Sequence, residues 1–525
     1  MKGPTGDGSF RVLAALCLGS FAILLDTTIV NVAVPSLIDT LRAGLDQVLW
    51  ISNAYLLVFG SLLITMSRLG DIFGQRRLFI LGLAVFGVFS ALGGAAQSPA
   101  ELIAATVPAQ RRGAALGVYN SMIMFAAVIG PTIGGVLVTY ADWRWIFYVN
   151  LPITAVAIVL AFRVLPDLRL GRRHRLDVVG VGLATGGLAG MVFGLIEGQR
   201  YSWGTIGGGP VTIPEVMIAG AALLVAFGLW ERARRDREPL LPAAVFRDKT
   251  VVLLCALTSA VQFALISVMI LAAINMQSVL GYSAVVSGLT ALPLSIVLAA
   301  LAPLAGRLSD RIGARPILVT GFTVYAAGLT VLILVLSTRA TPVTFIPPYI
   351  LIGLGMSCLF APLTTEALRR VRPEFTGALA GTLNTARQLG SCVGSAIVGG
   401  VLATLLADNM RAKAVATVGR LAAADRPSFL GGFARLGQTG LAVGRGQSGG
   451  AAVPASVPEP LRTQLQQLIH AIFTASYVDA MRTTLVIPVA LLLLSAVGCA
   501  LLIRPRRTGT DQVVKQARTV KSADA

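Results

Sequence analysis

The stretch "SRLGDIFGQRR" at residues 67–77 has a counterpart, "GRLSDRIGAR", at residues 306–315, and the two align without a gap. Each stretch follows one long apolar run and precedes another. The shared residues are Arg68 and Arg307, Leu69 and Leu308, Asp71 and Asp310, Gly74 and Gly313, and Arg76 and Arg315. A tight turn between helices also collects Gly, Asp and Arg, but a match of this length favours an internal repeat. Such a repeat in an apolar chain predicts two helical bundles with a substrate site between them.

The two repeated loops also predict how the bundles move. An Asp at a helix end can hold a helix N-terminus or a neighbouring Arg in one conformation and release it in another. We therefore expect these loops to act as latches between two rocking halves. The expected gating residues are Asp71, Gly74, Arg76 and Arg77 in the first loop and Asp310, Gly313 and Arg315 in the second.

The composition is that of a membrane protein. Of the 525 residues, 55% are hydrophobic and 13% are charged, which is far more apolar than a soluble domain of this size. Apolar runs of about 18 to 25 residues recur, and each is long enough as a helix to cross a hydrocarbon layer roughly 30 Å thick. Strand-length alternation is absent, so the fold class is all-α and polytopic, with the lipid bilayer as a partner.

The net charge of +19 does not predict nucleic-acid binding. A nucleic-acid surface would gather its basic residues on one soluble module, whereas here they are spread over short loops between apolar runs. By the positive-inside rule these loops face the cytoplasm. The basic loops span residues 67–77, 109–113, 163–175, 231–238, 307–316 and 368–374, together with the tail from Arg504.

The apolar runs between these loops predict about thirteen full transmembrane helices. They cover residues 12–34, 48–66, 78–96, 114–140, 146–162, 176–196, 213–230, 250–275, 283–305, 317–336, 346–366, 376–404 and 484–503. Together with the repeat, these helices predict the following order of domains along the chain. These are a cytoplasmic N-terminus at 1–11, an N-terminal bundle at 12–162, two linker helices with basic loops at 163–249, a C-terminal bundle at 250–404, a long extracytoplasmic loop at 405–483 with an amphipathic helix at 461–481, the last transmembrane helix at 484–503 and a basic cytoplasmic tail at 504–525.

One crossing is missing from this scheme. Neighbouring basic loops are separated by two apolar runs everywhere except between Arg77 and Arg111, where only the run 78–96 intervenes. Residues 97–110 would have to cross as well, but as a helix they reach only about 21 Å, short of the roughly 30 Å core. The sequence therefore predicts either a missing helix or a local inversion of the charge rule.

Asp26 lies well inside the first apolar run, and its neighbours at helical spacing, Ala22, Ile23, Ile29 and Val30, are apolar. An intramembrane carboxylate is costly, so it must face a polar cavity or carry a proton. Two roles stay open for it. Either Asp26 carries protons or cations for coupling, or its neutral acid forms a structural hydrogen bond to another helix.

Arg387 lies near the middle of the predicted helix 376–404, about 17 Å from Thr376 along the helix axis. Asn384 and Ser391 share its face at i−3 and i+4, so this stripe lines a cavity or clamps two helices together. We expect the cavity-lining residues to be Asn31, Asn384, Arg387 and Gln388.

Other polar groups predict structure rather than chemistry. Glu366 precedes Arg369, Arg370 and Arg372 at an inner helix end, where we expect an ion pair. Both histidines fall in predicted loops, and no group of residues has catalytic or metal-ligand spacing. The sequence therefore predicts a protein that is not an enzyme, binds no metal and needs no cofactor.

Several motifs together resemble the major facilitator superfamily, specifically its fourteen-helix drug:proton antiporters of the EmrB/QacA type. "LLDTTIVNVAVP" at 24–35 is similar to the first-helix signature of that branch, and residues 67–77 are similar to its loop between helices two and three. The likeness covers most of residues 20–400 and the last helix. Its further motifs are "GPTIGG" at 130–135, "DWRWIFYVNLP" at 142–152 and "GTLNTARQLG" at 381–390.

The resemblance implies a two-bundle fold with two linker helices, in the cytoplasmic membrane of a bacterium. It implies a monomer that exports hydrophobic or cationic small molecules in exchange for protons and is driven by the proton gradient. An antiporter role in sealing against proton leak is implied for the fifth-helix motif, whereas its plain reading is close helix packing. The motif residues concerned are Gly130, Pro131, Gly134 and Gly135.

The chain departs from the family pattern in two places. The family's fourth helix, whose Arg takes part in proton coupling, lies between an "ELIAA"-like start and a "P-x-x-x-R-G" end, and here those ends are joined directly near 97–110. Ser67 also stands where the family motif begins with Gly. The missing helix leaves open a transport-impaired or binding-only relative, and the motifs equally allow a dedicated exporter of one endogenous metabolite or antibiotic.

Overall fold

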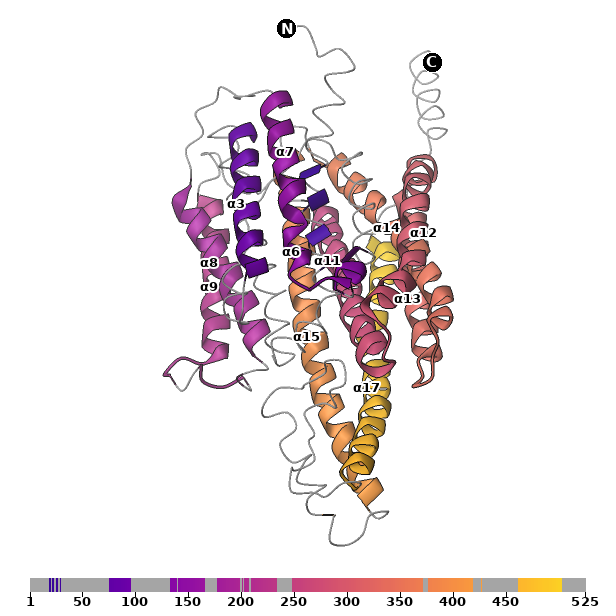
Figure 1. Cartoon of the computed structure of the whole chain (residues 1–525). Helices are drawn as coiled ribbons and strands as arrows, with labels where there is room; N and C mark the ends of the chain where they lie inside the picture. The colour runs from indigo at the N-terminus through magenta and orange to yellow at the C-terminus, as the bar shows by residue number, and fades with distance from the viewer. Residues whose placement is uncertain are drawn as a thin grey trace, which may run out of the picture.

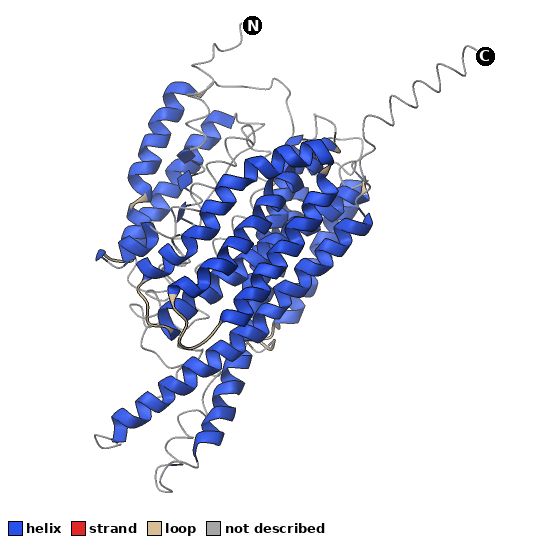
Figure 2. Cartoon of the chain, turned by 90° about the vertical axis from the view of Figure 1, so that its right-hand side faces the viewer, coloured by secondary structure: helices blue, strands red, loops and turns tan. Residues whose placement is uncertain are grey.

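The computed structural model describes residues 75–95, 133–165, 177–233, 248–371, 376–418 and 461–502, apart from a few positions within them, together with Arg426 and some helical residues between 18 and 29. Nearly all of this part of the chain is helical (Figure 2). The helices are α3 Gln75–Ala95, α6 Trp145–Tyr148, α7 Asn150–Val164, α8 Val178–Glu197, α9 Ile213–Ala233, α11 Lys249–Ile274, the π-helix η1 Asn275–Val279, α12 Ala284–Ile312, α13 Ala314–Val335, the 3₁₀-helix η2 Pro342–Phe345, α14 Ile346–Arg369, α15 Thr376–Val418 and α17 Leu461–Leu502.

The predicted all-α membrane fold is confirmed for the described residues. Within them, eight helical stretches are long and apolar enough to cross a bilayer. The expected total of thirteen depends on stretches outside the described residues. These are the runs 48–66 and 114–132 and most of 12–34, together with the short connection at 97–110.

Short polar side chains start three of the membrane helices. The carboxylate of Asp177 accepts a hydrogen bond from the N–H of Gly180 at the start of α8, and Asp248 does the same for Thr250 at the start of α11. Ser283 caps α12 through the N–H of Val286. Each cap satisfies a backbone donor that the first turn of a helix leaves without a partner.

Helices α11 to α17 form the C-terminal bundle, in which α11 packs on α15 and α14 packs on both α12 and α13 (Figure 1). Small residues set the closest approaches, because a Cβ at Gly355 would lie 2.5 Å from the backbone nitrogen of Tyr325. A Cβ at Gly390 would lie 2.2 Å from the carbonyl oxygen of Ser259. Small residues are the usual means of close helix packing in lipid, where the hydrophobic effect does not drive association.

The N-terminal elements and the linker helices complete the arrangement. Helix α3 packs on α6 and α7, and the linker helices α8 and α9 form a hairpin whose first member contacts α15. Figure 1 shows this hairpin beside α3, away from α13 and α17. The lipid-facing character of α9 is clear from Ile218, Val225 and Leu229, which are largely exposed.

Two helices are much longer than predicted. Helix α15 continues from the predicted end at residue 404 to Val418. The amphipathic helix predicted at 461–481 is helical, but it is continuous with the last membrane helix, so that α17 runs from Leu461 to Leu502. Both ends of the predicted loop 405–483 are therefore helical, and the two helices extend past the rest of the bundle (Figures 1 and 2). They remain ordered because buried Met410, Ala414 and Phe473 give them a shared apolar seam beyond the bundle.

Three other boundaries also differ. The predicted loop 307–316 is almost entirely helical, because α12 runs to Ile312 and α13 starts at Ala314. The turn is confined to Gly313, whose φ of +93° suits a residue without a side chain. The predicted helix 146–162 is interrupted at Val149, between α6 and α7, and the predicted helix 250–275 ends in the π-helix η1.

Candidate functional site

Asp26 belongs to a buried network of three polar side chains, with Asn150 and Ser90 as the other two. The Nδ2 group of Asn150, at the first position of α7, donates to the Oδ1 atom of Asp26 at 2.7 Å and to the Oγ atom of Ser90 at 3.1 Å. Ser90, on α3, in turn donates to the carbonyl of Phe147 on α6 at 2.9 Å. Asp26 is only 7% exposed, and Asn150 is fully buried. The network therefore joins the first predicted membrane helix to α3, α6 and α7.

Asn150 lies at the junction of α6 and α7, where Val149 keeps helical backbone angles. The N–H of Val149 still bonds to the carbonyl of Trp145, and α7 then starts at Asn150. On the neighbouring turn, Thr154 donates to the carbonyl of Asn150 within α7. The side-chain amide makes its shorter hydrogen bonds to Asp26 and Ser90 and a longer one, at 3.5 Å, to the carbonyl of Ile146 on α6, whereas its Oδ1 atom has no hydrogen-bond partner among the described residues.

The N-terminal and C-terminal bundles touch next to this network. A Cβ at Gly134 would lie 3.2 Å from the Cα of Ile29, one helical turn from Asp26. A Cβ at Gly135 would lie 2.6 Å from the carbonyl oxygen of Ala284 at the start of α12. Any side chain at Gly135 would therefore push the two bundles apart at this point.

Arg387 shows both features that the sequence left open. Its Nη2 group donates to the Oγ1 atom of Thr364 at 3.0 Å, which clamps α15 to α14. Its guanidinium lies 5.6 Å from the ring centroid of Phe360, a cation–π distance. It also lines a small cavity of about 10 Å³, which is room for about one water molecule. The other lining residues are Thr258, Val261, Gln262, Phe360 and Leu363.

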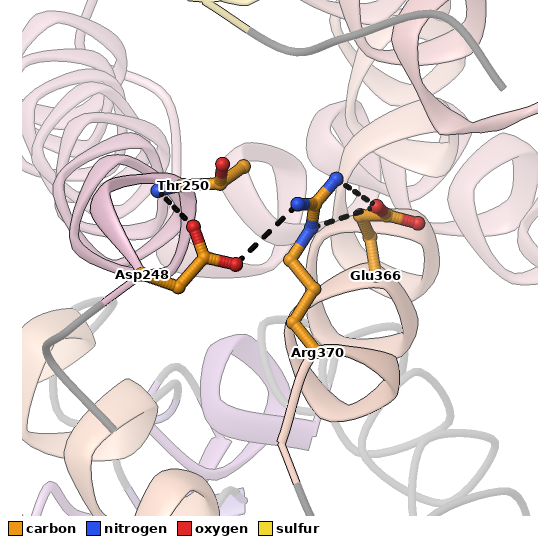
Figure 3. Close-up of polar contacts among 4 residues, drawn as sticks. All are labelled: Asp248, Thr250, Glu366 and Arg370. Atoms are coloured by element: carbon orange, nitrogen blue, oxygen red, sulfur yellow. Dashed lines mark hydrogen bonds and ion pairs between the residues drawn. The ribbon is translucent and has the colours of Figure 1, made fainter. Parts of the chain in front are cut away.

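An ionic cluster lies at the opposite end of the C-terminal bundle from Gly135, the end that carries Arg307, Arg315 and Arg369; we call it the Arg-rich end. There Arg370 bonds to Glu366 at 2.7 Å within α14 and to Asp248 before α11 at 3.5 Å (Figure 3). The predicted ion pair of Glu366 is confirmed. Burial disfavours the charged form of Asp248, but the N–H of Thr250 and the charge of Arg370 outweigh it and lower the pKa of Asp248.

The expected gating residues of the second loop meet partners at the same end. Asp310 forms an ion pair with Arg369 at 2.7 Å, joining α12 to α14. Arg315 donates to the carbonyl of Ala500 on α17. In the first loop, Arg76 donates to the carbonyl of Phe162 on α7, and Arg77 is exposed. Each described member of the two loops except Arg77 thus contacts a neighbouring helix or, for Gly313, makes the turn.

Several expected site residues are not brought together. Asn384 and Gln388 are half-buried on α15 but are not among the residues that line the cavity beside Arg387. Asn31, Asp71, Gly74, Gly130 and Pro131 lie outside the described residues. The described part of the chain contains no group of three or more His, Cys, Asp or Glu side chains placed to hold a metal ion.

Sequence reasoning missed Asn150, Ser90 and Asp248 as site residues. Asn150 could have been identified from the sequence, because it is a polar residue inside the motif at 142–152 and follows an apolar run. Ser90 is small and common in membrane helices, so its spacing alone does not single it out. Asp248 is recognisable as a helix cap, but its pairing with Arg370 depends on the tertiary fold.

A sequence profile of the Major Facilitator Superfamily matches residues 16–395. The chain belongs to this superfamily, and it is a membrane transporter rather than an enzyme. The resemblance seen in its motifs is therefore confirmed.

Three relatives carry names that assign them to export or resistance. The puromycin resistance protein pur8 of Streptomyces alboniger is 35% identical over 76% of this chain and 83% of its own length. The multidrug resistance protein Stp of Mycobacterium tuberculosis is 32% identical over 75% of this chain and 76% of its own length. The tetracenomycin C resistance and export protein of Streptomyces glaucescens is 30% identical over 75% of this chain and 76% of its own length.

Solved structures agree with the fold. A bacterial homologue of the human lysosomal transporter Spinster, in an inward-facing unoccupied conformation, matches with a TM-score of 0.55 at 16% identity, over 94% of this chain and 98% of that one. A bacterial homologue of the human drug peptide transporters PepT1 and PepT2 also matches with a TM-score of 0.55, at 12% identity, over 94% of this chain and 98% of that one.

Proposed function

We propose that this transporter exports hydrophobic or cationic drugs and other small toxic compounds across the cytoplasmic membrane, in exchange for protons. The names of the relatives support export of drugs or antibiotics. Proton coupling rests on one observation, the carboxyl group of Asp26, which is buried and accepts a hydrogen bond from the neutral amide of Asn150. A buried acid without a fixed positive partner at hydrogen-bond distance among the described residues can lose and regain a proton.

The energy available from one proton is sufficient for export. A proton that moves through 100 mV releases about 2.3 kcal/mol, which sustains a gradient of roughly fiftyfold for one neutral solute. An apolar cavity with few fixed polar groups would accept many substrates. In this proposal the cavity is lined by Asn31, Asn384, Arg387 and Gln388, and it lies between the two bundles.

In this proposal the repeated loops and the fifth-helix motif close the two sides of the transporter. The two repeated loops latch the bundles at the Arg-rich end, which we place on the cytoplasmic side together with both termini. The fifth-helix motif seals the opposite side, in line with the close packing of Gly135 on Ala284. We place the protein in a bacterial cell membrane as a monomer that needs no cofactor.

The test is drug-driven proton movement in liposomes that contain the purified protein. We expect ethidium, a hydrophobic cation, to drive proton movement by the wild type, and we expect Asp26→Asn to reduce that signal to the level of empty liposomes. Asp26→Glu, which keeps a titratable group, should retain part of it. Native rates in a correctly folded Asp26→Asn protein would rule out Asp26 as the proton carrier.

A second candidate function comes from the short connection at residues 97–110, which lacks room for the family's fourth helix. It is a relative that binds such compounds but does not transport them. The two functions separate in one experiment, because a binding-only protein would quench ethidium fluorescence in detergent but move neither ethidium nor protons in energised liposomes. A dedicated exporter of one compound would instead transport that compound and not ethidium.

A further inference from the structure

We infer that the side-chain amide of Asn150 senses the protonation state of Asp26 and relays it, through Ser90, to helix α6. Asn150 is thus a positioning residue for the proton carrier, and Ser90 is the second member of the relay. The inference rests on the proposed role of Asp26. Its evidence is the geometry of the three side chains and the buried Oδ1 atom of Asn150, which accepts no hydrogen bond from the described residues.

The arrangement in the structure suits the charged form of Asp26. The Asn150 amide nitrogen donates to the Oδ1 atom of Asp26 at 2.7 Å and to the Oγ atom of Ser90 at 3.1 Å, and its contact with the carbonyl oxygen of Ile146, at 3.5 Å, is the longest of the three. Ser90 receives the bond from Asn150 and passes its own hydrogen to the carbonyl of Phe147. Asn150 thus donates along two branches, one to Asp26 and one through Ser90 to the carbonyl of Phe147. A carboxylate, which only accepts hydrogen bonds, is the natural end of the first branch.

The protonated form of Asp26 cannot keep this pattern at the same contact if its proton sits on Oδ1. A carboxylic acid presents an O–H donor, which would face the N–H of the amide. A half-turn of the Asn150 amide about its Cβ–Cγ bond removes the conflict, because it exchanges the positions of Nδ2 and Oδ1. The Oδ1 atom, with two lone pairs, then accepts the O–H of Asp26 and the O–H of Ser90.

The proton count of this step balances. One proton from water adds to Asp26, while Asn150 and Ser90 keep all their hydrogens and only reorient them. Ser90 redirects its hydroxyl from the carbonyl of Phe147 to Asn150. Protonation of Asp26 therefore removes a bond that holds α3 to α6, two residues before the junction at Val149. Loss of a buried bond to a helix carbonyl weakens the hold on that helix.

The ionisable groups on the surrounding elements do not compete for this role. On α3 they are Arg76 and Arg77, at the Arg-rich end, and on α7 the ionisable group is Arg163, at the same end. Before α6, Asp142 and Arg144 form an ion pair with each other at 3.3 Å. The described side chains that bond within the network are neutral apart from Asp26.

Infrared difference spectroscopy tests the relay in the full-length protein in liposomes. Asparagine labelled with ¹³C in its side-chain carbonyl marks the amide bands, and Asn150→Leu identifies the band of Asn150. We expect the acid-minus-base spectrum of the wild type to show a carboxylic acid C=O band together with a shift of the Asn150 band. Asp26→Asn should lose both signals. A carboxylic acid band without any shift of the Asn150 band would overturn the inference.

Transport measurements provide a second readout. Asn150→Leu should lower ethidium-driven proton movement by about tenfold, because it removes a charge-assisted hydrogen bond. Ser90→Ala should move the midpoint of the pH profile of transport, and Ser90→Thr should restore it. The matched control is Thr154→Val, one turn away on α7, which should transport within about twofold of the wild type since its bond stays within the helix. An unchanged pH profile in Ser90→Ala would also contradict the relay.

Failure of the relay and failure of the proposed function can be told apart. If Asp26 does not carry protons, Asp26→Asn transports like the wild type, whatever the spectra show. If Asp26 carries protons but Asn150 does not respond, Asp26→Asn is inactive while the Asn150 band stays fixed.

Discussion

The Asp26 network in the N-terminal bundle and the Arg370 cluster at the Arg-rich end of the C-terminal bundle both tie helices together, but they do so in opposite ways. In the first, one buried acid bonds to a neutral amide and a neutral hydroxyl completes the network. In the second, a cation bonds to two carboxylates, Asp248 and Glu366, and all three side chains keep contact with solvent (Figure 3). Only the first can change its charge without breaking an ion pair.

This difference suits the Asp26 network to proton transfer and the Arg370 cluster to holding helices together. A buried acid held by neutral groups can adopt two protonation states with different hydrogen bonds, so a proton can shift the equilibrium between them. An ion pair at the surface keeps one state over the whole physiological pH range and contributes modest stability. In the proposed mechanism the charge that changes is that of Asp26 within the bilayer, whereas the Arg370 cluster at the helix ends keeps its charges.

The strongest way to break this comparison is to give Asp26 a fixed partner. Asn150→Lys would place an ammonium group against the carboxylate and hold it charged. We expect ethidium-driven proton movement to fall by about tenfold or more, since an ion pair at this depth resists protonation. Size-exclusion chromatography would confirm the fold. Wild-type transport by a folded Asn150→Lys protein would show that the neutrality of the network is irrelevant.

The contact between the bundles gives the next largest effect. Gly135→Leu should reduce transport by about fivefold to a hundredfold, because overpacking of about 1 to 3 kcal/mol would disfavour the closed contact with Ala284. It should also raise the passive proton leak, measured with a pH-sensitive dye in liposomes. The control is Gly182→Leu on α8, where no atom lies within 4 Å of an added Cβ. Equal leak in the two variants would contradict a sealing role.

A smaller effect is expected from the fixed charges. Arg370→Gln removes the cation between Asp248 and Glu366, and we expect a loss of about 1 kcal/mol in stability because the pairs are partly exposed. The measurement is the melting temperature in detergent. Transport should stay within about threefold of the wild type. A collapse of transport with unchanged stability would assign the cluster to the mechanism and remove the contrast with Asp26.

The smallest expected effect is on acid stability. The pKa of Asp248 is lowered in the folded protein, so its contribution is present above its unfolded pKa and is lost as the pH falls through its folded pKa. The wild type should therefore lose more stability between pH 5 and 3 than Asp248→Asn does, by a few tenths of a kcal/mol for so exposed a group. Parallel melting curves for the two proteins across this range would show that Asp248 contributes nothing.

Much of the fold was predictable from the sequence, for reasons that individual residues illustrate. Apolar runs bounded by Arg identify membrane helices because lipid leaves the backbone no other partner, and the ion pair of Glu366 followed from its i+4 spacing to Arg370. Asp26 stood out because a carboxylate is rare inside an apolar run. These are local signals, and each needs only a few neighbouring residues.

The rest depended on contacts between distant residues. The partner of Asp26 lies at Asn150, on another helix, and no spacing rule connects the two. The predicted loops failed where tertiary contacts kept helices going, as at α12 to Ile312 and at α15 to Val418. Hydropathy marks where a helix leaves the lipid, whereas a helix ends where its backbone groups find other partners.

The extra length of α15 and α17 has a mechanical consequence. At 1.5 Å per residue, the 43 residues of α15 measure about 65 Å, roughly twice the hydrocarbon thickness, so in our proposed membrane placement α15 and α17 form an arm that extends some 30 Å beyond the hydrocarbon core. The salt bridge between Lys413 and Asp479 braces its two helices at 2.5 Å. A tilt of the C-terminal bundle by about 10° would swing the tip of this arm by roughly 5 Å. A spectroscopic label at Val415, near the end of this arm, would therefore report a larger displacement than a label within the bundle.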